Sequence, residues 1–152
     1  MPYSGLAVEE LNIDPKLKDF LLKKGIRYLY PPQVEALSKG VLEGKNIVLA
    51  SHTASGKTLI AELLFLKRFL EGNMGKAVYM VPLKAIASEK YEEFKELKEY
   101  GVRIALTTGD YDSEDEYLEN YDVIITTNEK FDSLLRHRPR WVKDVSVLVI
   151  DE

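Results

Sequence analysis

The sequence predicts an α/β fold in which a mostly parallel sheet is flanked by helices. Short β-rich runs recur along the chain, separated by helical or loop sequence. The runs are nearly continuous in Val, Ile and Leu, which favours strands covered by helices on both faces. Distinctive polar residues follow the runs, at the sheet edge where such folds bind ligands. The expected strands are 46–50, 77–81, 102–107, 123–126 and 145–150.

Helices are expected before and between these strands. The segment 15–24 begins with Pro and precedes the first strand. Two apolar stripes with helical spacing follow the first and second strands, and we interpret them as core. The stripes are Leu59, Leu63, Leu66 and Leu70, and then Ala87, Tyr91, Phe94 and Leu97.

Length and composition indicate one globular domain, because 152 residues with 45% apolar side chains can bury a sizeable core. No apolar run approaches the length of about 20 residues that spans a bilayer, and the N-terminus lacks a signal-peptide pattern. The absence of Cys excludes disulfides and thiolate metal sites, and two isolated His residues make no zinc cluster. These features predict a cytoplasmic protein without membrane contact.

The net charge of −4 is not typical of a protein that coats nucleic acid nonspecifically, although one face can still be basic. The segment 110–122 carries much of the negative charge and contains no Lys or Arg. We interpret it as a solvated helix face, because the glycine and the final Glu of a calcium loop are missing.

The segment 51–58, Ser-His-Thr-Ala-Ser-Gly-Lys-Thr, lies between the first expected strand and a helix. Backbone N–H groups at such a junction converge on one point, where the helix dipole also favours an anion. Gly56 allows a phosphate to approach closely, Lys57 can reach the β- and γ-phosphates, and Thr58 can ligate Mg²⁺. The alternative is a simple helix cap made by Ser-Gly-Lys-Thr. The pattern predicts nucleotide binding.

Five segments together resemble the motifs of superfamily 2 helicases of the DExH type. They correspond in order and spacing to the Q motif, motifs I, Ia and Ib, and the start of motif II: 30–33, 53–58, 82–85, 126–130 and 151–152. Within that superfamily, the chain is especially similar to the archaeal Hjm-type DNA helicases of the Ski-like branch, in the segments 29–33, 53–58, 81–85, 108–112 and 129–136. The resemblance implies a RecA-like P-loop NTPase domain over 1–152, with an N-terminal helix and Q motif in 1–33 and the sheet in 34–152.

The resemblance implies ATP and Mg²⁺ as cofactors. Gln33 would recognise adenine through its amide. Asp151 would hold Mg²⁺ together with Thr58, while Glu152 would orient and deprotonate the attacking water. Lys57, Asp151 and Glu152 are thus the implied catalytic residues. The phosphates would be held by Thr53, Ala54, Ser55, Gly56, Lys57 and Thr58.

Lys84, Thr127 and Lys130 are the implied contacts to a nucleic-acid strand, because motif Ia and Ib residues of the family touch its backbone. Such contacts position a strand without reading its sequence. For either Lys, an ordinary solvated side chain is the alternative. The segment 136–141 adds Arg residues beside Trp141, a composition that could grip a single strand. Here we expect Trp141 to pack in the core and the Arg side chains to be solvated.

Two departures from the family pattern stand out. Ser51 and His52 replace residues more usual at the start of the phosphate loop, where side chains face outward. The chain also stops at Glu152, before the rest of motif II, motif III and the second RecA-like domain. We therefore expect a piece of a longer helicase, with its C-terminal helicase domains missing.

That parent is expected to be an ATP-driven DNA helicase that moves 3′ to 5′ on single-stranded or branched DNA in repair or recombination. The piece alone should bind ATP but not unwind. The alternatives are a Ski-like RNA helicase, which the residues do not distinguish, and a noncatalytic nucleotide-binding module.

Overall fold

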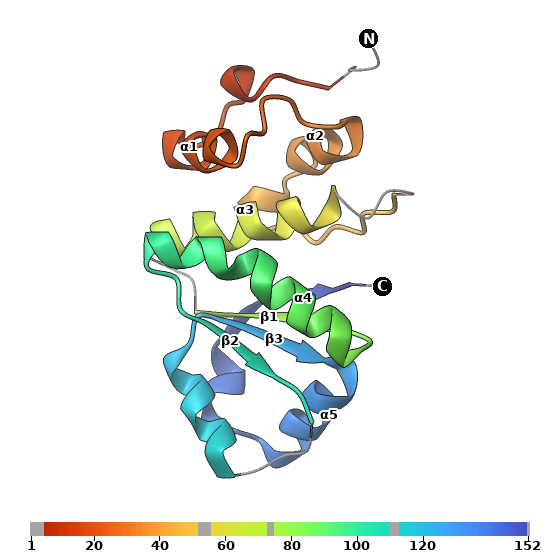
Figure 1. Ribbon diagram of the computed structural model, residues 1–152, viewed down its shortest axis with the longest axis vertical. Coiled ribbons are helices and arrows are strands. Elements are labelled where there is room, and N and C mark those ends of the chain that lie inside the picture. Colours follow the sequence, from red (N-terminus) through yellow and green to blue (C-terminus); the bar gives the residue numbers. More distant parts are fainter. Residues whose placement is uncertain (1–4, 52–55, 73–74, 110–112, 152) are drawn as a thin grey trace. The chain divides into compact units, whose positions relative to one another are not determined.

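The computed structural model describes residues 5–51, 56–72, 75–109 and 113–151 (Figure 1). The chain forms two compact units, Met1–Lys67 and Arg68–Glu152. The boundary lies within helix α3 (Lys57–Leu70). Thr53, Ala54, Ser55 and Glu152, which the sequence placed in the nucleotide site, lie outside the described residues.

The first unit is helical. Helix α1 (Pro15–Lys23) begins at Pro15, and the Asp14 side chain caps it by accepting a hydrogen bond from the Lys16 N–H at 2.8 Å. This helix confirms the expected segment 15–24 to within one residue. Helix α2 (Pro31–Ser38) starts on the Pro pair of the Q motif. Single 3₁₀ turns at Val8–Glu10 and Val41–Glu43 complete the unit before α3.

The strand expected at 46–50 is not formed, so this part of the sequence prediction is wrong. The side chain of Val48 is 98% exposed, although the sequence favoured burial. A strand exists only through hydrogen bonds to a neighbour, and all four strands of the sheet come from the second unit. Local β-propensity therefore was not sufficient here.

The second unit contains a four-stranded sheet in the order β2-β3-β1-β4. Its strands are β1 (Lys76–Val81), β2 (Ile104–Thr107), β3 (Val123–Thr127) and β4 (Val145–Ile150). All three pairings are parallel. These strands confirm the predicted parallel α/β architecture and four of the five expected strands, with ends that differ by two residues at most.

Helices α4 (Lys84–Phe94) and α5 (Asn128–His137) cover opposite faces of this sheet (Figure 1). Tyr79 packs edge-on against Phe94 of α4, with ring centroids 5.0 Å apart. Its neighbour Val78 packs instead in a cluster with Phe131 and Leu134 of α5. Successive strand side chains point to opposite faces, so the two helices enclose β1 between them.

Short 3₁₀ helices complete the unit at η3 (Lys95–Tyr100), η4 (Ser113–Asn120) and η5 (Arg140–Asp144). Trp141 is 1% exposed and belongs to the cluster on the α5 side, which confirms that it packs in the core. In η4, Leu118 is fully buried while Glu116 and Glu119 are exposed. Glu116 and Glu119 therefore lie on a solvated helical face, as the sequence indicated for the acidic segment, whereas Asp122 at its end is buried.

Charged side chains at the amino end of the sheet form hydrogen bonds to other groups of the protein. The buried Lys76 ammonium donates hydrogen bonds to the carbonyls of Leu118, Glu119 and Tyr121, at 3.3, 2.5 and 2.7 Å. Burial lowers the pKa of Lys76, because the charged amine loses its hydration.

The Asp122 carboxylate, also at the amino end, accepts hydrogen bonds from both the backbone N–H and the guanidinium of Arg103. The hydrogen bond to Asp122, with the attraction between the opposite charges, raises the pKa of Arg103.

Among the described residues, no helix is long and apolar enough to span a membrane.

Candidate functional site

The described part of the phosphate loop leads directly into helix α3. Gly56 and Thr58 are buried, and Lys57 is half-buried at the first position of the helix. The Lys57 ammonium donates to the Ser51 carbonyl at 3.4 Å, across the loop that joins them. The sequence thus places Lys57 and Thr58 at the N-terminus of a 14-residue helix, where the helix dipole favours an anion.

Gln33 links the Q motif to the phosphate loop inside the first unit. Its side-chain oxygen accepts a hydrogen bond from the Tyr30 N–H at 2.7 Å, and its amide nitrogen donates to the Gly56 carbonyl at 3.0 Å. The residue is 4% exposed. An amide has two donors and about two acceptor sites, so one N–H and one lone pair remain beyond these bonds. The tether to Gly56 was not foreseen from the sequence.

Asp151 follows the carboxyl end of β4 and is half-buried. Its backbone N–H donates to the Met80 carbonyl at 2.9 Å, which continues the pairing with β1. Its Oδ2 accepts a hydrogen bond from the Tyr79 hydroxyl at 2.6 Å. Within the described part of the chain, no group of three His, Asp or Glu side chains is arranged to hold a metal.

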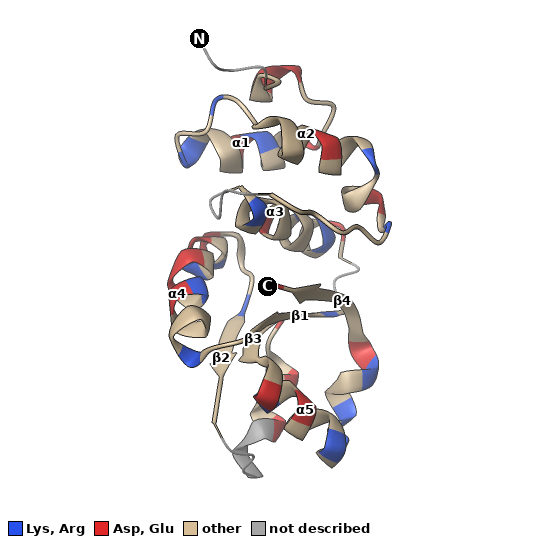
Figure 2. Ribbon diagram, turned by 90° about the vertical axis from the view of Figure 1, so that its right-hand side faces the viewer, with Lys and Arg blue, Asp and Glu red and all other residues tan. Residues whose placement is uncertain are grey.

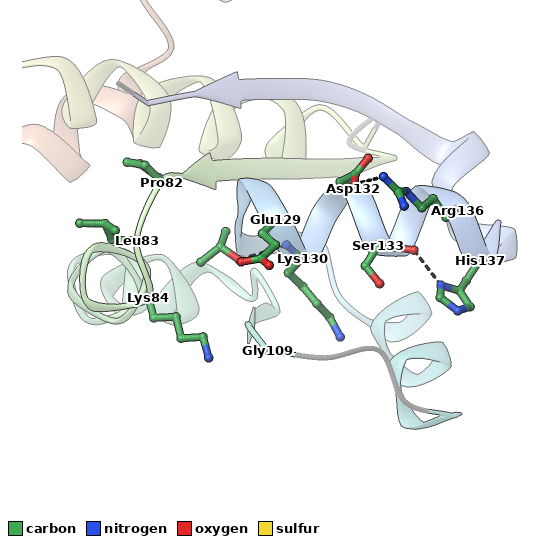
Figure 3. A pocket seen from close by; sticks show the side chains of 11 residues that line it. Pro82, Leu83, Lys84, Gly109, Glu129, Lys130, Asp132, Ser133, Arg136 and His137 are labelled. Carbon is green, nitrogen blue, oxygen red and sulfur yellow. Dashed lines mark hydrogen bonds and ion pairs between the residues drawn. The ribbon is translucent and has the colours of Figure 1, made fainter.

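A pocket of about 720 Å³ lies within the second unit, beyond the carboxyl ends of the strands (Figure 3). Lys84 at the start of α4, Thr127 at the end of β3 and Lys130 on α5 all line it. These are the three residues that the sequence assigned to the nucleic-acid strand, and the fold brings them to one hollow. Parallel strands end at the same edge, which explains why residues so distant in sequence meet.

The two lysines differ in accessibility. Lys84 is exposed, whereas Lys130 is 2% exposed, with its backbone N–H donating to the Thr127 hydroxyl at 3.2 Å. This bond caps α5, because the Thr127 side chain satisfies an N–H of the first turn. Thr127 and Lys130 therefore have a structural task as well as a place in the pocket wall.

Ser133, Arg136 and His137 also line the pocket, although they were not among the predicted contacts. In Figure 3, Ser133 and His137 lie together along one side of α5, while Arg136 turns toward Asp132. Arg136 forms an ion pair with Asp132 at 2.9 Å and stays largely exposed. One sequence signal points to Arg136, namely the Arg-rich segment 136–141, although its composition alone favours solvated Arg side chains.

His137 is held on the helix, where its Nδ1 lies 2.8 Å from the Ser133 carbonyl and must donate to it. Both acidic and basic residues occur along α4 and α5 (Figure 2). The pocket is therefore not uniformly basic, and any anion bound there would meet Lys84 and Arg136 beside Glu129 and Asp132.

Comparison with known proteins identifies the family. The model of the DEAD/DEAH box helicases matches residues 30–152. The chain belongs to this family. It is 58% identical over 147 residues to the ATP-dependent DNA helicase Hel308 of Pyrococcus horikoshii, and 52% identical over 152 residues to that of Methanocella arvoryzae. Each match covers 97% of this chain and 20% of the relative, so the chain spans about a fifth of their length.

A solved structure gives the same result for the fold. The chain resembles the DUF1998 helicase MrfA, whose crystal structure is bound to DNA and AMPPNP, with a TM-score of 0.75 and 32% identity. The match covers 92% of this chain and 21% of MrfA. The RecA-like fold and the resemblance to the Hjm-type helicases are thereby confirmed.

Proposed function

We propose that this chain is the first RecA-like motor domain of an ATP-driven DNA helicase that moves 3′ to 5′ and acts in DNA repair or recombination. The observation that carries the proposal is the pocket in which Lys84, Thr127 and Lys130 meet. The relatives named ATP-dependent DNA helicase Hel308, and a helicase neighbour bound to DNA, support DNA rather than RNA.

Nucleotide binding is proposed for the N-terminus of α3. Lys57 would hold the β- and γ-phosphates, Gly56 and its neighbours Thr53, Ala54 and Ser55 would surround them, and Gln33 would face the base. Gln33 already holds the loop through Gly56, which supports its place at the nucleotide site.

The residue types at the proposed metal site fit Mg²⁺. The Thr58 hydroxyl and the Asp151 carboxylate are hard oxygen donors, and Mg²⁺ binds such ligands while keeping several waters. When bound, the ion would neutralise charge on the phosphates. Asp151 would orient its water shell, and Glu152 would accept the proton of the attacking water.

The proposed strand contacts are electrostatic. Lys84 is exposed at the pocket and can approach a phosphate directly, while Arg136 offers a second cation that Asp132 holds in place. Lys130 is 2% exposed, so little of its side chain is accessible to a ligand. We therefore rank Lys84 and Arg136 above Lys130 as backbone contacts.

The decisive experiment compares Lys57→Ala with Lys39→Ala in the full-length protein proposed here. Both lysines lie in the first unit, but Lys39 is exposed at the end of α2. We expect Lys57→Ala to lower DNA-stimulated ATP hydrolysis by about 10² to 10³, since one charge-stabilising group is lost. Lys39→Ala should retain full activity, and equal activity in both variants would contradict the assignment of the loop.

The same assay on this chain alone tests the domain proposal. Phosphoryl transfer in this class uses charges from a second domain, so we expect weak Mg·ATP binding, little hydrolysis and no strand separation. Hydrolysis by the isolated chain at the full-length rate would instead favour a self-sufficient ATPase. The cytoplasmic location predicted from composition stays a prediction, to be checked by cell fractionation.

A further inference from the structure

The Tyr79 hydroxyl contacts the carboxylate proposed for the metal site. It donates a hydrogen bond to Asp151 Oδ2 at 2.6 Å, a short distance typical of a charge-assisted bond. Tyr79 lies in β1 and pairs in register with Val149 of β4. Asp151 comes two residues after Val149, so its side chain lies on the same face of the sheet as Tyr79.

Both partners of this bond are fixed by their surroundings. The Tyr79 ring is 2% exposed and packs edge-on against the fully buried Phe94, at an interplanar angle of 79°. On the other side, the Asp151 backbone is held by its N–H bond to Met80. With ring and backbone both fixed, the hydroxyl restricts the carboxylate to one orientation.

We propose that Tyr79 is a positioning residue, which orients the Asp151 carboxylate toward the divalent cation of a bound nucleoside triphosphate. This inference rests on the proposed function. Because the hydroxyl occupies Oδ2, Oδ1 would be the oxygen that serves the cation. Mg²⁺ requires near-ideal geometry, so a ligand that is already oriented binds it better than one that rotates.

A purely structural role is the competing explanation. A buried Tyr hydroxyl needs a hydrogen-bond partner, and Asp151 could serve only to satisfy it. The two explanations differ in what the loss of the hydroxyl changes. A structural bond affects stability alone, whereas a positioning bond changes the affinity for the cation.

The test uses Tyr79→Phe in the full-length protein, with Mn²⁺ as the probe and AMPPNP as the nucleotide. Free Mn²⁺ is measured by electron paramagnetic resonance, so no turnover is needed. We expect Mn²⁺ to bind about 10-fold more weakly, as for other residues that hold a metal ligand. AMPPNP affinity in the absence of metal should not change, because the phosphate loop is intact.

Tyr91→Phe is the matched control. Its hydroxyl accepts a hydrogen bond from the Lys98 ammonium at the surface of the same unit, 3.1 Å away. We expect wild-type Mn²⁺ affinity in this variant. Unchanged or tighter Mn²⁺ binding in Tyr79→Phe, or an equal loss in Tyr91→Phe, would overturn the positioning role.

A double variant shows whether Tyr79 acts through Asp151. Adding Tyr79→Phe to Asp151→Ala should cause no further loss of Mn²⁺ affinity, and a further loss would contradict the inference. The proposed function is judged separately, by ATP hydrolysis of the wild type. If the wild type hydrolyses ATP while Tyr79→Phe binds Mn²⁺ normally, only the positioning role fails.

Discussion

The two ends of the parallel sheet contain similar charged side chains in different settings. At the amino end, Lys76 is buried on three carbonyls and Arg103 is held by Asp122. At the carboxyl end, Lys84 is exposed and lines a pocket. The Asp151 carboxylate accepts the Tyr79 hydrogen bond through Oδ2. The amino end thus uses its charges to hold the fold, whereas Lys84 at the carboxyl end stays accessible for the binding role proposed above.

The difference follows from how a parallel sheet is built. Every strand of this sheet ends at the same edge, so the loops that follow are brought together there without having to be buried. Substitutions at the amino end should therefore reduce stability, and substitutions at the carboxyl end should reduce binding. Four substitutions test this comparison.

Asp122→Ala should have the largest effect on stability. It removes the acceptor of three hydrogen bonds from Arg103, one of them from the backbone N–H at 2.8 Å. We expect a loss of about 3 kcal/mol in the free energy of unfolding, because the backbone N–H and the guanidinium of Arg103 both lose their acceptor. Urea denaturation measures this loss. A change below about 1 kcal/mol would mean that the amino end is not held by this pair.

Lys76→Met should cost less, about 1 to 2 kcal/mol, since the lost hydrogen bonds are partly offset by relief from burying an amine. The pH dependence is more specific. The pKa of Lys76 is lowered in the folded state, so the unfolded state binds the proton more tightly. Wild-type stability should therefore rise, relative to Lys76→Met, as the pH increases toward the ordinary pKa of 10.5. Parallel stability curves for the two proteins would contradict this account.

Thr127→Val sharpens the comparison, because it tests a residue at the carboxyl end that stabilises the fold. The hydroxyl caps α5 through the Lys130 N–H, and its loss should cost about 1 kcal/mol of stability. Thr127→Ser keeps the hydroxyl and serves as the control, measured by the same thermal unfolding. A loss in Thr127→Ser without a loss in Thr127→Val would assign the stabilisation to packing of the methyl group instead of the cap, because only Ser lacks that methyl.

Lys84→Ala should leave stability within about 0.5 kcal/mol of wild type, since the side chain is exposed. Single-stranded DNA should nevertheless bind more weakly, by the same factor for every sequence. The slope of log affinity against log salt should fall in magnitude by about 0.7, the value for one lost phosphate contact. Lys95→Ala, on the neighbouring η3, is the control. An unchanged slope would make Lys84 an ordinary surface residue.

The second unit was the more predictable part of the chain. Strands β1 and β3 are buried over most of their length, as their apolar sequences indicated, whereas β4 is equally apolar in sequence but only Val147 of it is buried. Lys84 and Thr127 line the same pocket. This could be predicted because both follow strands that end at one edge of a parallel sheet, and because both belong to motifs of the helicase resemblance. Arg136 was missed as a pocket residue because an Arg on a polar helix face looks like solvated surface.

The first unit was less predictable for a physical reason. The run 46–50 has the composition of a strand, but pairing depends on a distant neighbour that composition does not specify. Hydrogen bonds such as that between Gln33 and Gly56 depend on loop geometry. The bond from Tyr79 to Asp151 likewise depends on the register of β1 against β4, which was known only from the structure.

The two hydrogen bonds of Gln33 also determine which way its amide can face. A half-turn of the amide would bring its NH₂ group against the Tyr30 N–H and its oxygen against the Gly56 carbonyl, two repulsive pairings in place of two bonds. The orientation is therefore locked before any ligand arrives. The remaining N–H and lone pair keep fixed directions, so the base proposed for this site would have to match them without a flip of the side chain.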